Sequence, residues 1–355
     1  MQNKFRVASA VVLAAALSVA TPAATGTMRS VSGLDSPRGV ATRPGEFVVA
    51  QGDGSITSIV RSGPREGKHK LIGKVPKGSL AAALDVGPGG VVWALTPGAD
   101  KVTKGAGTLY RFAPGKRRQM VLNVQRWQRR NPDPYDLESR PKESNPYGVA
   151  ALDNGSVLVA DAANNSLLMV RPDGRAHLVA RVKPRTVSMP EGMEGEGMPP
   201  AGTRMKSEAV VTSVTVGADG AYYIGELRGF PGTPGTSQIW RIRPNAKGAV
   251  CNPKRPARGA CTRYVDGMTS VVSLAAGRGG ALFVAELSKK GWMSLESQAP
   301  GSDVGAIIRI SHDKSLRREL KPGKFRMPGA VTVGGSGRVF ATTPLFGPGK
   351  IKRAY

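Results

Sequence analysis

The chain has 355 residues, enough to bury a large core, and it is rich in turn-forming residues, with 46 Gly and 27 Pro. These residues neither repeat every three positions nor gather in tracts, which excludes a collagen-like or low-complexity chain and favours many turns between short strands. Lys and Arg outnumber Asp and Glu by 51 to 25. The net charge of +26 indicates either an anionic surface or polymer as partner, or solvated loop charge with no dedicated ligand.

The first 24 residues have the pattern of a signal peptide. Lys4 and Arg6 form a short basic region, the apolar stretch Val7–Ala20 follows, and small residues come next. This stretch is too short to cross a membrane, and no later segment is long and apolar enough to do so. The sequence therefore predicts a secreted or periplasmic protein, cleaved between Ala20 and Gly26.

One pattern recurs six times along the rest of the chain: a short apolar strand, a Gly-rich turn and a second apolar strand. The six copies occupy residues 39–50, 83–94, 148–160, 213–225, 273–285 and 330–341. A third strand is predicted after each copy, at 56–60, 108–112, 166–170, 238–242, 306–310 and 350–353. A weaker fourth strand follows in the first five copies. Repeats of this kind are typical of a β-propeller, because one small sheet cannot cover both of its own faces.

The predicted fold is therefore an all-β, six-bladed β-propeller that occupies residues 27–355 as one domain. The sixth copy reaches Tyr355 after only three strands, while a spare strand at 27–32 precedes the first copy. We expect this N-terminal strand to complete the last blade and close the ring. The first residue of each inner strand is small, as the crowded axis of a propeller requires: Gly39, Ala83, Gly148, Ser213, Ser273 and Ala330.

The two cysteines flank a basic, Pro-rich loop. Cys251 and Cys261 are ten residues apart in the sequence. In an oxidising compartment two such neighbours are expected to form a disulfide, with two free thiols as the alternative. Two cysteines alone are too few for a structural zinc site.

Aligning the six copies places a polar residue directly after every second strand. The second strand runs antiparallel to the inner strand, so its end lies on the same face as the start of the inner strand. This column is therefore expected to ring one mouth of the central channel, with carboxylates in three consecutive copies. The candidate mouth residues are Asp161, Glu226, Glu286, Asn145, Thr212 and Thr269.

Converging carboxylate, amide and hydroxyl oxygens suit Ca²⁺, which takes six to eight oxygen ligands. A pocket for another ligand is the second interpretation of this mouth. The third is a wet polar rim, or carboxylates paired with neighbours such as Arg38 and Arg228. No catalytic residue is predicted, because the three histidines fall on outer strands or turns and leave no histidine base at the centre: His69, His177 and His312.

Three stretches carry a more specific pattern. They are Ser-Asn-Pro-Tyr-Gly-Val-Ala at 144–150, Tyr-Ile-Gly-Glu-Leu-Arg-Gly-Phe-Pro at 223–231 and Gly-Met-Thr-Ser-Val at 267–271. They resemble the ScyD/ScyE family of exported bacterial proteins, and the resemblance covers about residues 30 to 355. It implies an NHL-like six-bladed propeller, but no established activity and no agreed catalytic residues. The very basic loops and the cysteine loop depart from the family pattern.

Three functions fit these observations. The first is a non-catalytic binding or scaffold propeller with a ligand at the channel mouth. The second is a Ca²⁺-dependent hydrolase or lactonase acting through Asp161, Glu226 and Glu286. The third is a protein that binds an anionic polymer of the cell envelope through its basic loops, marked by steep salt dependence. Export argues against nucleic acid as the partner, and we expect a monomer without a transmembrane segment.

Overall fold

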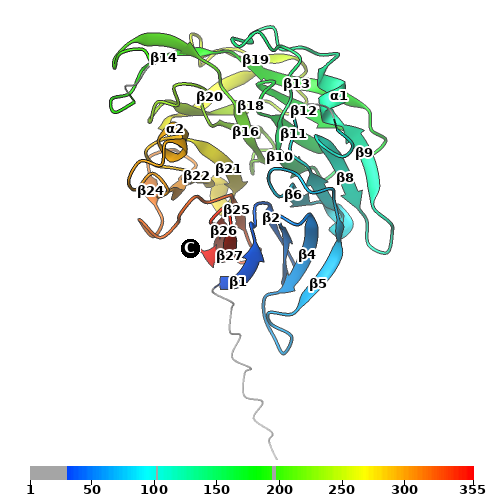
Figure 1. Cartoon of the computed structure of the whole chain (residues 1–355). Helices are drawn as coiled ribbons and strands as arrows, with labels where there is room; N and C mark the ends of the chain where they lie inside the picture. Colours follow the sequence, from blue (N-terminus) through cyan, green and yellow to red (C-terminus); the bar gives the residue numbers. More distant parts are fainter. Residues whose placement is uncertain (1–29, 101–102, 194–196) are drawn as a thin grey trace, which may run out of the picture.

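The computed structural model describes residues 30–100, 103–193 and 197–355, so the predicted signal peptide lies outside the described residues. Six small antiparallel sheets stand around a common axis, with their inner strands at the centre (Figure 1). This arrangement confirms the predicted six-bladed β-propeller. In the described part of the chain, no helix is long and apolar enough to cross a membrane.

The first three blades follow the predicted repeats. Blade 1 consists of β2 (Val40–Arg43), β3 (Glu46–Ala50), β4 (Ser55–Val60) and β5 (His69–Lys74). Blade 2 consists of β6 (Ala83–Val86), β7 (Val92–Leu95), β8 (Thr108–Phe112) and β9 (Gln119–Asn123). Blade 3 consists of β10 (Pro146–Ala151), β11 (Val157–Asp161), β12 (Ser166–Val170), β13 (Ala176–Val182) and an additional edge strand, β19 (Ala249–Cys251).

The last three blades complete the ring. Blade 4 consists of β16 (Val211–Val216), β17 (Tyr222–Glu226), β18 (Ser237–Ile242) and β20 (Cys261–Met268). Blade 5 consists of β21 (Val271–Ala276), β22 (Leu282–Glu286), β23 (Ala306–Ile310) and β24 (Arg317–Glu319). Blade 6 consists of β25 (Ala330–Val333), β26 (Val339–Thr343), β27 (Pro348–Arg353) and β1 (Ser30–Asp35).

The N-terminal strand closes the ring, as predicted. β1 pairs antiparallel with β27, with Ser30 opposite Lys352 and Leu34 opposite Gly349. Leu34 is 1% exposed, so the strand also contributes an apolar side chain to the core between blades 6 and 1. The last blade thus combines the first and last strands of the described chain.

Small residues at the start of the inner strands are required by the close approach of neighbouring blades. A Cβ atom added at Gly39 would lie 2.6 Å from the carbonyl oxygen of Ala82 in the next blade. At Gly148 it would lie 2.7 Å from the carbonyl oxygen of Thr212. Both distances are shorter than van der Waals contact with backbone atoms that cannot move aside, so any larger residue would push two blades apart.

Apolar side chains fill the spaces between blades. One cluster joins blade 3 to blade 4 and contains the fully buried Trp240, Val179 and Ala180. A second joins blade 2 to blade 3 around Trp93. Burying such side chains is the main favourable term in folding, worth about 1.5–3 kcal/mol for each large residue.

Five strands and α-helices were not predicted from the sequence. A hairpin of β14 (Arg185–Ser188) and β15 (Arg204–Ser207) lies in the connector between blades 3 and 4, and two short helices, α1 (Val124–Gln128) and α2 (Trp292–Glu296), lie in other connectors. β19 lies between two strands of blade 4 in the sequence, but it pairs in parallel with β13, the outer strand of blade 3.

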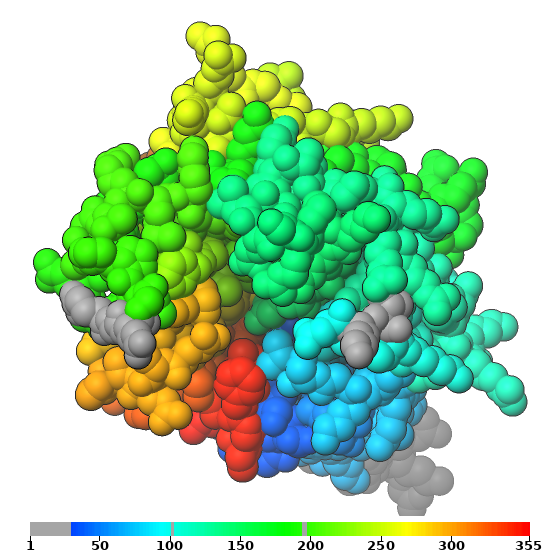
Figure 2. Space-filling view, turned by 45° about the horizontal axis from the view of Figure 1, so that its top comes forward, coloured from blue at the N-terminus to red at the C-terminus, as the bar shows by residue number. Residues whose placement is uncertain are grey.

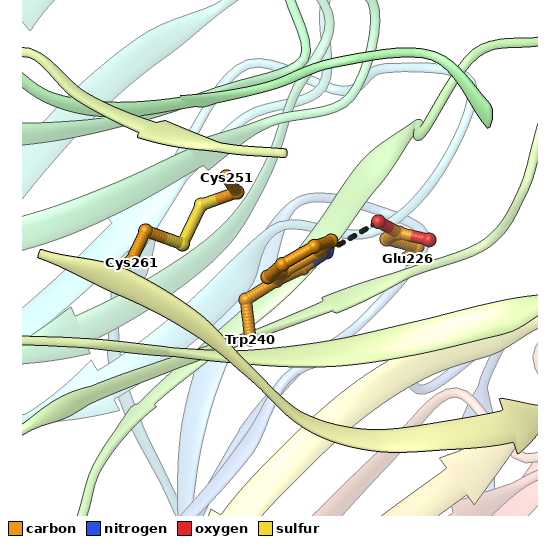
Figure 3. The surroundings of a disulfide bond; sticks show 4 residues. All are labelled: Glu226, Trp240, Cys251 and Cys261. Carbon is orange, nitrogen blue, oxygen red and sulfur yellow. Dashed lines mark hydrogen bonds between the residues drawn. A yellow bond between two sulfur atoms is a disulfide. The ribbon is translucent and has the colours of Figure 1, made fainter. Parts of the chain in front are cut away.

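The predicted disulfide between Cys251 and Cys261 is present. Cys251 ends β19 and Cys261 begins β20, so the bond joins the edge strand of blade 3 to the outer strand of blade 4. Both cysteines are fully buried and belong to the same core cluster as Trp240 (Figure 3). The loop between them carries basic residues into solvent, and this part of the chain, coloured yellow, protrudes at the top of Figure 2.

Candidate functional site

The predicted column of carboxylates has the expected register. Asp161 lies opposite Pro146, Glu226 opposite Val211 and Glu286 opposite Val271. Each carboxylate is therefore at the end of its blade where the inner strand begins. The surroundings of the three side chains, however, differ from one another and from an open channel mouth.

The Asp161 carboxylate is fully buried within blade 3 and the connector before it. It accepts hydrogen bonds from the Ser144 hydroxyl at 2.6 Å, the Asn145 backbone N–H at 2.8 Å and the Asn164 backbone N–H at 3.2 Å. The Gln128 side-chain amide donates a fourth bond at 3.2 Å. Burial raises the pKa of Asp161, and these donors oppose the rise. The carboxylate thus fastens the 124–145 connector to its blade.

The Glu226 carboxylate is equally enclosed in blade 4. It forms an ion pair with Arg228, which is also fully buried, and it accepts a 2.5 Å hydrogen bond from the Trp240 indole N–H. Figure 3 shows the Trp240 ring with Glu226 on one side and the disulfide on the other. Arg228 in turn donates to the Glu208 carbonyl at 3.0 Å. One of the sequence-based alternatives, pairing of a carboxylate with Arg228, is therefore what the structure has.

Glu286 is 5% exposed, and it accepts a 2.7 Å hydrogen bond from the Thr269 backbone N–H. Burial raises its pKa to about 7, although Arg317 lies 3.9 Å away. The Thr269 hydroxyl accepts from the Gly235 N–H at 3.0 Å. Glu286 and Thr269 thus hold connectors of blades 4 and 5 together.

These residues do not fit the predicted Ca²⁺ site. In the described residues, no group of three His, Cys, Asp or Glu side chains is placed to hold a metal ion. The physical reason is that strands within a blade are about 4.8 Å apart. The second strand is therefore one strand further from the axis, and its side chains point between blades. None of the three carboxylates lines the central cavity, and of the other predicted mouth residues Thr212 lines it whereas Asn145 and Thr269 do not.

We expect the melting temperature of the protein to be the same in EDTA and in excess Ca²⁺. A site holding metal at a hundred times its Kd would add about 2.7 kcal/mol to the free energy of unfolding. The carboxylate oxygens of Asp161 and Glu226 are already occupied by internal donors, which leaves no coordination sphere to complete. Thermal melts in the two buffers test this, and a Ca²⁺-dependent rise of several degrees would contradict it.

The six inner strands surround a central channel. It has a volume of about 320 Å³ and is lined by residues of all six inner strands. Its walls carry hydroxyl groups from Thr42, Ser213, Thr215, Ser273 and Thr332 among small apolar residues. Most of these hydroxyls bond to neighbouring backbone, as Thr42 does to the Val333 carbonyl at 2.9 Å. The Ser213 hydroxyl is buried and has no partner among the described residues.

Arg38 and Tyr147 occupy the end of the channel where the inner strands begin. The Arg38 guanidinium is 2% exposed, donates to the Ala81 carbonyl at 3.0 Å and to the Tyr147 carbonyl, and lies 3.9 Å from the centre of the Tyr147 ring. Burial lowers the pKa of Arg38. The side chain bridges blades 1, 2 and 3 and narrows this end of the channel.

Asp85 is the acidic residue on the channel wall, and the sequence-based reasoning missed it. It is the third residue of an inner strand. Its carboxylate accepts hydrogen bonds from the backbone N–H groups of Val86 and Ala151, each at 2.8 Å. Burial raises the pKa of Asp85 to about 6, and these two donors oppose the rise. The signal was present in the aligned copies, because Asp85 stands where the others have Ala41, Ala150, Thr215, Ala275 and Thr332.

Because the pKa of Asp85 is raised, we expect the free energy of unfolding to depend on pH. The folded-state pKa lies above that of an unfolded aspartate, so its contribution to stability is fully present below about pH 4 and is lost as the pH rises through about 6. The stability of the wild type relative to Asp85→Asn should therefore fall between these two pH values. Denaturant unfolding of both proteins at several pH values measures this difference. Glu286→Gln, compared in the same way, measures the separate contribution of Glu286, whose pKa is raised to about 7. A pH-independent Asp85→Asn difference would contradict the expectation.

The three histidines lie where the repeat register predicts. His69 is in β5, His177 is in β13, and His312 is in the turn after β23. None of them lines the channel. A histidine base is therefore not available to the Ser213 hydroxyl.

Comparisons with known proteins show the fold and leave the family open. No family model and no curated protein matches the chain. A PQQ-bound aldose sugar dehydrogenase from Streptomyces coelicolor aligns at 14% identity and a TM-score of 0.55, covering 92% of this chain and 96% of that one. A glucose dehydrogenase aligns at 12% identity and a TM-score of 0.56, covering 93% and 99%. A streptogramin B lyase aligns at 16% identity and a TM-score of 0.49, covering 90% and 94%. The chain thus shares the six-bladed propeller architecture of the two dehydrogenases.

Proposed function

We propose that this protein is an exported, non-catalytic binding propeller of the ScyD/ScyE type whose ligand occupies the central channel. The observation that carries the proposal is the channel itself, a cavity of about 320 Å³ with the Asp85 carboxyl and several hydroxyl side chains among its lining residues. A cavity of this size with polar lining groups holds water or a ligand.

The residues that line the channel suit a small polar ligand. Thr and Ser hydroxyls accept and donate, and the Asp85 carboxylate accepts above its raised pKa. A ligand that carries hydroxyl or ammonium donors would satisfy both groups. The lining residues include no His, Lys or Cys, so no imidazole, amine or thiol is available in the channel as a base or nucleophile.

The family and the export remain parts of this proposal. The stretches that resemble ScyD/ScyE proteins include Ser144 and Glu226. Ser144 bonds to Asp161 and so fixes a connector to blade 3, and Glu226 pairs with the buried Arg228 in blade 4. Those stretches therefore support a shared architecture. The dehydrogenase neighbours, at 12 and 14% identity, share the fold, and their activities do not carry over.

The test is a thermal-shift screen of monosaccharides, polyols and small primary amines. At least one compound is expected to raise the melting temperature of the wild type, and the rise should disappear in Asp85→Asn. Asp173→Asn, in an exposed turn outside the channel, is the matched control and should behave as the wild type. The proposal fails if none of these compounds shifts the wild type, or if the shift survives in Asp85→Asn.

A further inference from the structure

A second cavity lies at the seam between the first and last blades. This seam pocket has a volume of about 500 Å³ and is lined by Thr42, Arg43, Pro44, Gly45, Arg61, Ser62, Gly335, Ser336, Arg338 and Phe340. Thr42 also lines the channel. Because Thr42 is near the end of β2 and Arg38 precedes its start, the seam pocket adjoins the end of the channel opposite Arg38.

Three arginines line the seam pocket, and only one of them is neutralised. Arg43 pairs with Glu46 at 2.5 Å. Arg61 and Arg338 form no ion pair with any acidic residue in the described ranges, and each is near enough to the other for their charges to interact. Their two positive charges are therefore held together without a counter-charge from the protein.

Arg61 is fixed in position. Its guanidinium lies 5.2 Å from the centre of the Phe47 ring, and its Nη2 donates to the Arg43 carbonyl at 3.5 Å. Across the seam, a Cβ atom at Gly334 would lie 2.9 Å from its Nη1, so the absence of a side chain there makes room for the guanidinium. Its Nε–H is buried and has no partner among the described residues. Burial lowers the pKa of Arg61, and the charge of Arg338 lowers it further.

The rim of the pocket adds further donors. Arg338 donates from Nη1 to the Ser336 hydroxyl at 3.3 Å. Arg278, from blade 5, donates to the Gly335 carbonyl and so places another positive charge at the rim of the pocket. The Ser62 hydroxyl lies on the opposite wall. The net charge of the side chains around the pocket stays strongly positive even when the negative charge of Glu46 is counted.

We propose that the seam pocket binds a phosphate group between Arg61 and Arg338. A guanidinium presents its N–H donors in a fork that matches two oxygens of a phosphate, and such charge-assisted bonds are the strong ones. A phosphate offers oxygens to two guanidinium groups and to the serine hydroxyls at once, more than the two oxygens of a carboxylate can supply. It would also relieve the repulsion between the two like charges.

The test is calorimetric titration of the full chain with inorganic phosphate and with sodium polyphosphate. Arg61→Gln/Arg338→Gln is expected to bind at least about tenfold more weakly, because it loses the charge-assisted hydrogen bonds from both guanidinium groups. The matched control is Arg129→Gln/Arg130→Gln, which removes the same charge from two exposed positions and should leave affinity nearly unchanged. Arg338→Gln alone, at the half-buried edge, keeps the contacts of Arg61 and should weaken binding severalfold.

Two results would overturn the proposal: binding of neither inorganic phosphate nor polyphosphate by the wild type, or equal weakening by the two double variants, which would mark nonspecific attraction to the +26 chain. Binding of inorganic phosphate that depends on Arg61 and Arg338 would identify free phosphate as a ligand. Binding of polyphosphate alone, with the same dependence, would identify a phosphate group within a larger polyanion as the ligand. The outcome is independent of the channel, because the screen with Asp85→Asn uses neutral or cationic compounds.

Discussion

Replacing Glu226 by Gln is expected to lower the free energy of unfolding by about 3–5 kcal/mol, because removing one partner of a buried ion pair leaves the other charge uncompensated. Arg228 is fully enclosed, and Glu226 is its ion-pair partner. The Glu226 carboxylate also accepts the Trp240 indole N–H at the core between blades 3 and 4. Chemical denaturation with two probes, fluorescence and circular dichroism, measures the loss.

Two further variants separate this effect from a loss of charge alone. Asp219→Asn breaks a half-exposed ion pair with Arg241 in the same blade, at 2.7 Å, and should change stability by about 1 kcal/mol or less. Adding Arg228→Met to Glu226→Gln removes the stranded charge and should recover much of the lost stability. If Glu226→Gln proved as mild as Asp219→Asn, the buried pair would not have the role given to it here.

Removing the disulfide is the second change with a large expected effect. The double variant Cys251→Ser/Cys261→Ser should lose about 2–4 kcal/mol, since native disulfides closing loops of this size contribute about that much. The bond also holds β19 on the edge of β13. The N–H groups of Gly248 and Lys183 donate across the edge between β13 and β19, to the Leu178 and Cys251 carbonyls at 3.0 Å each. Hydrogen exchange at these two amides should therefore become faster in the variant.

The matched control for the disulfide is Val250→Ser. Val250 is in β19 between the same two blades, but it is 40% exposed, so this variant keeps the bond and should be nearly as stable as the wild type. Equal exchange rates at Gly248 and Lys183 in the double variant and the wild type would show that β19 stays in place without the bond.

The architecture could be predicted because its signals are local. Each blade repeats an apolar strand, a turn and another strand within a short stretch of sequence, and three predicted third strands, Thr108–Phe112, Ser166–Val170 and Ala306–Ile310, have the bounds found in the structure. The unpaired strand before the first copy and the missing strand of the last copy together predicted the closure of the ring. The disulfide followed from two nearby cysteines.

The candidate site could not be predicted to the same degree, because it depends on side-chain direction and on contacts between distant blades. The position of Glu226 at a strand end was predicted, but its turn toward Trp240 and Arg228 depends on how blade 4 packs. Arg61 and Arg338 come from the first and last blades, and they meet only when the ring closes. Asp85, in contrast, could have been found by comparing the third residues of the inner strands.

The pairing of β1 with β27 places a condition on the order in which the molecule can form. The chain is synthesised from its amino end, so β1 is made long before its partner β27. The edge of β1 therefore stays unpaired until the final strand of the last blade has formed. Contacts between such distant segments are formed late, since the chain between them must be ordered first. Removing either β1 or β27 would therefore damage the same blade, and with it the wall on which Arg338 lies.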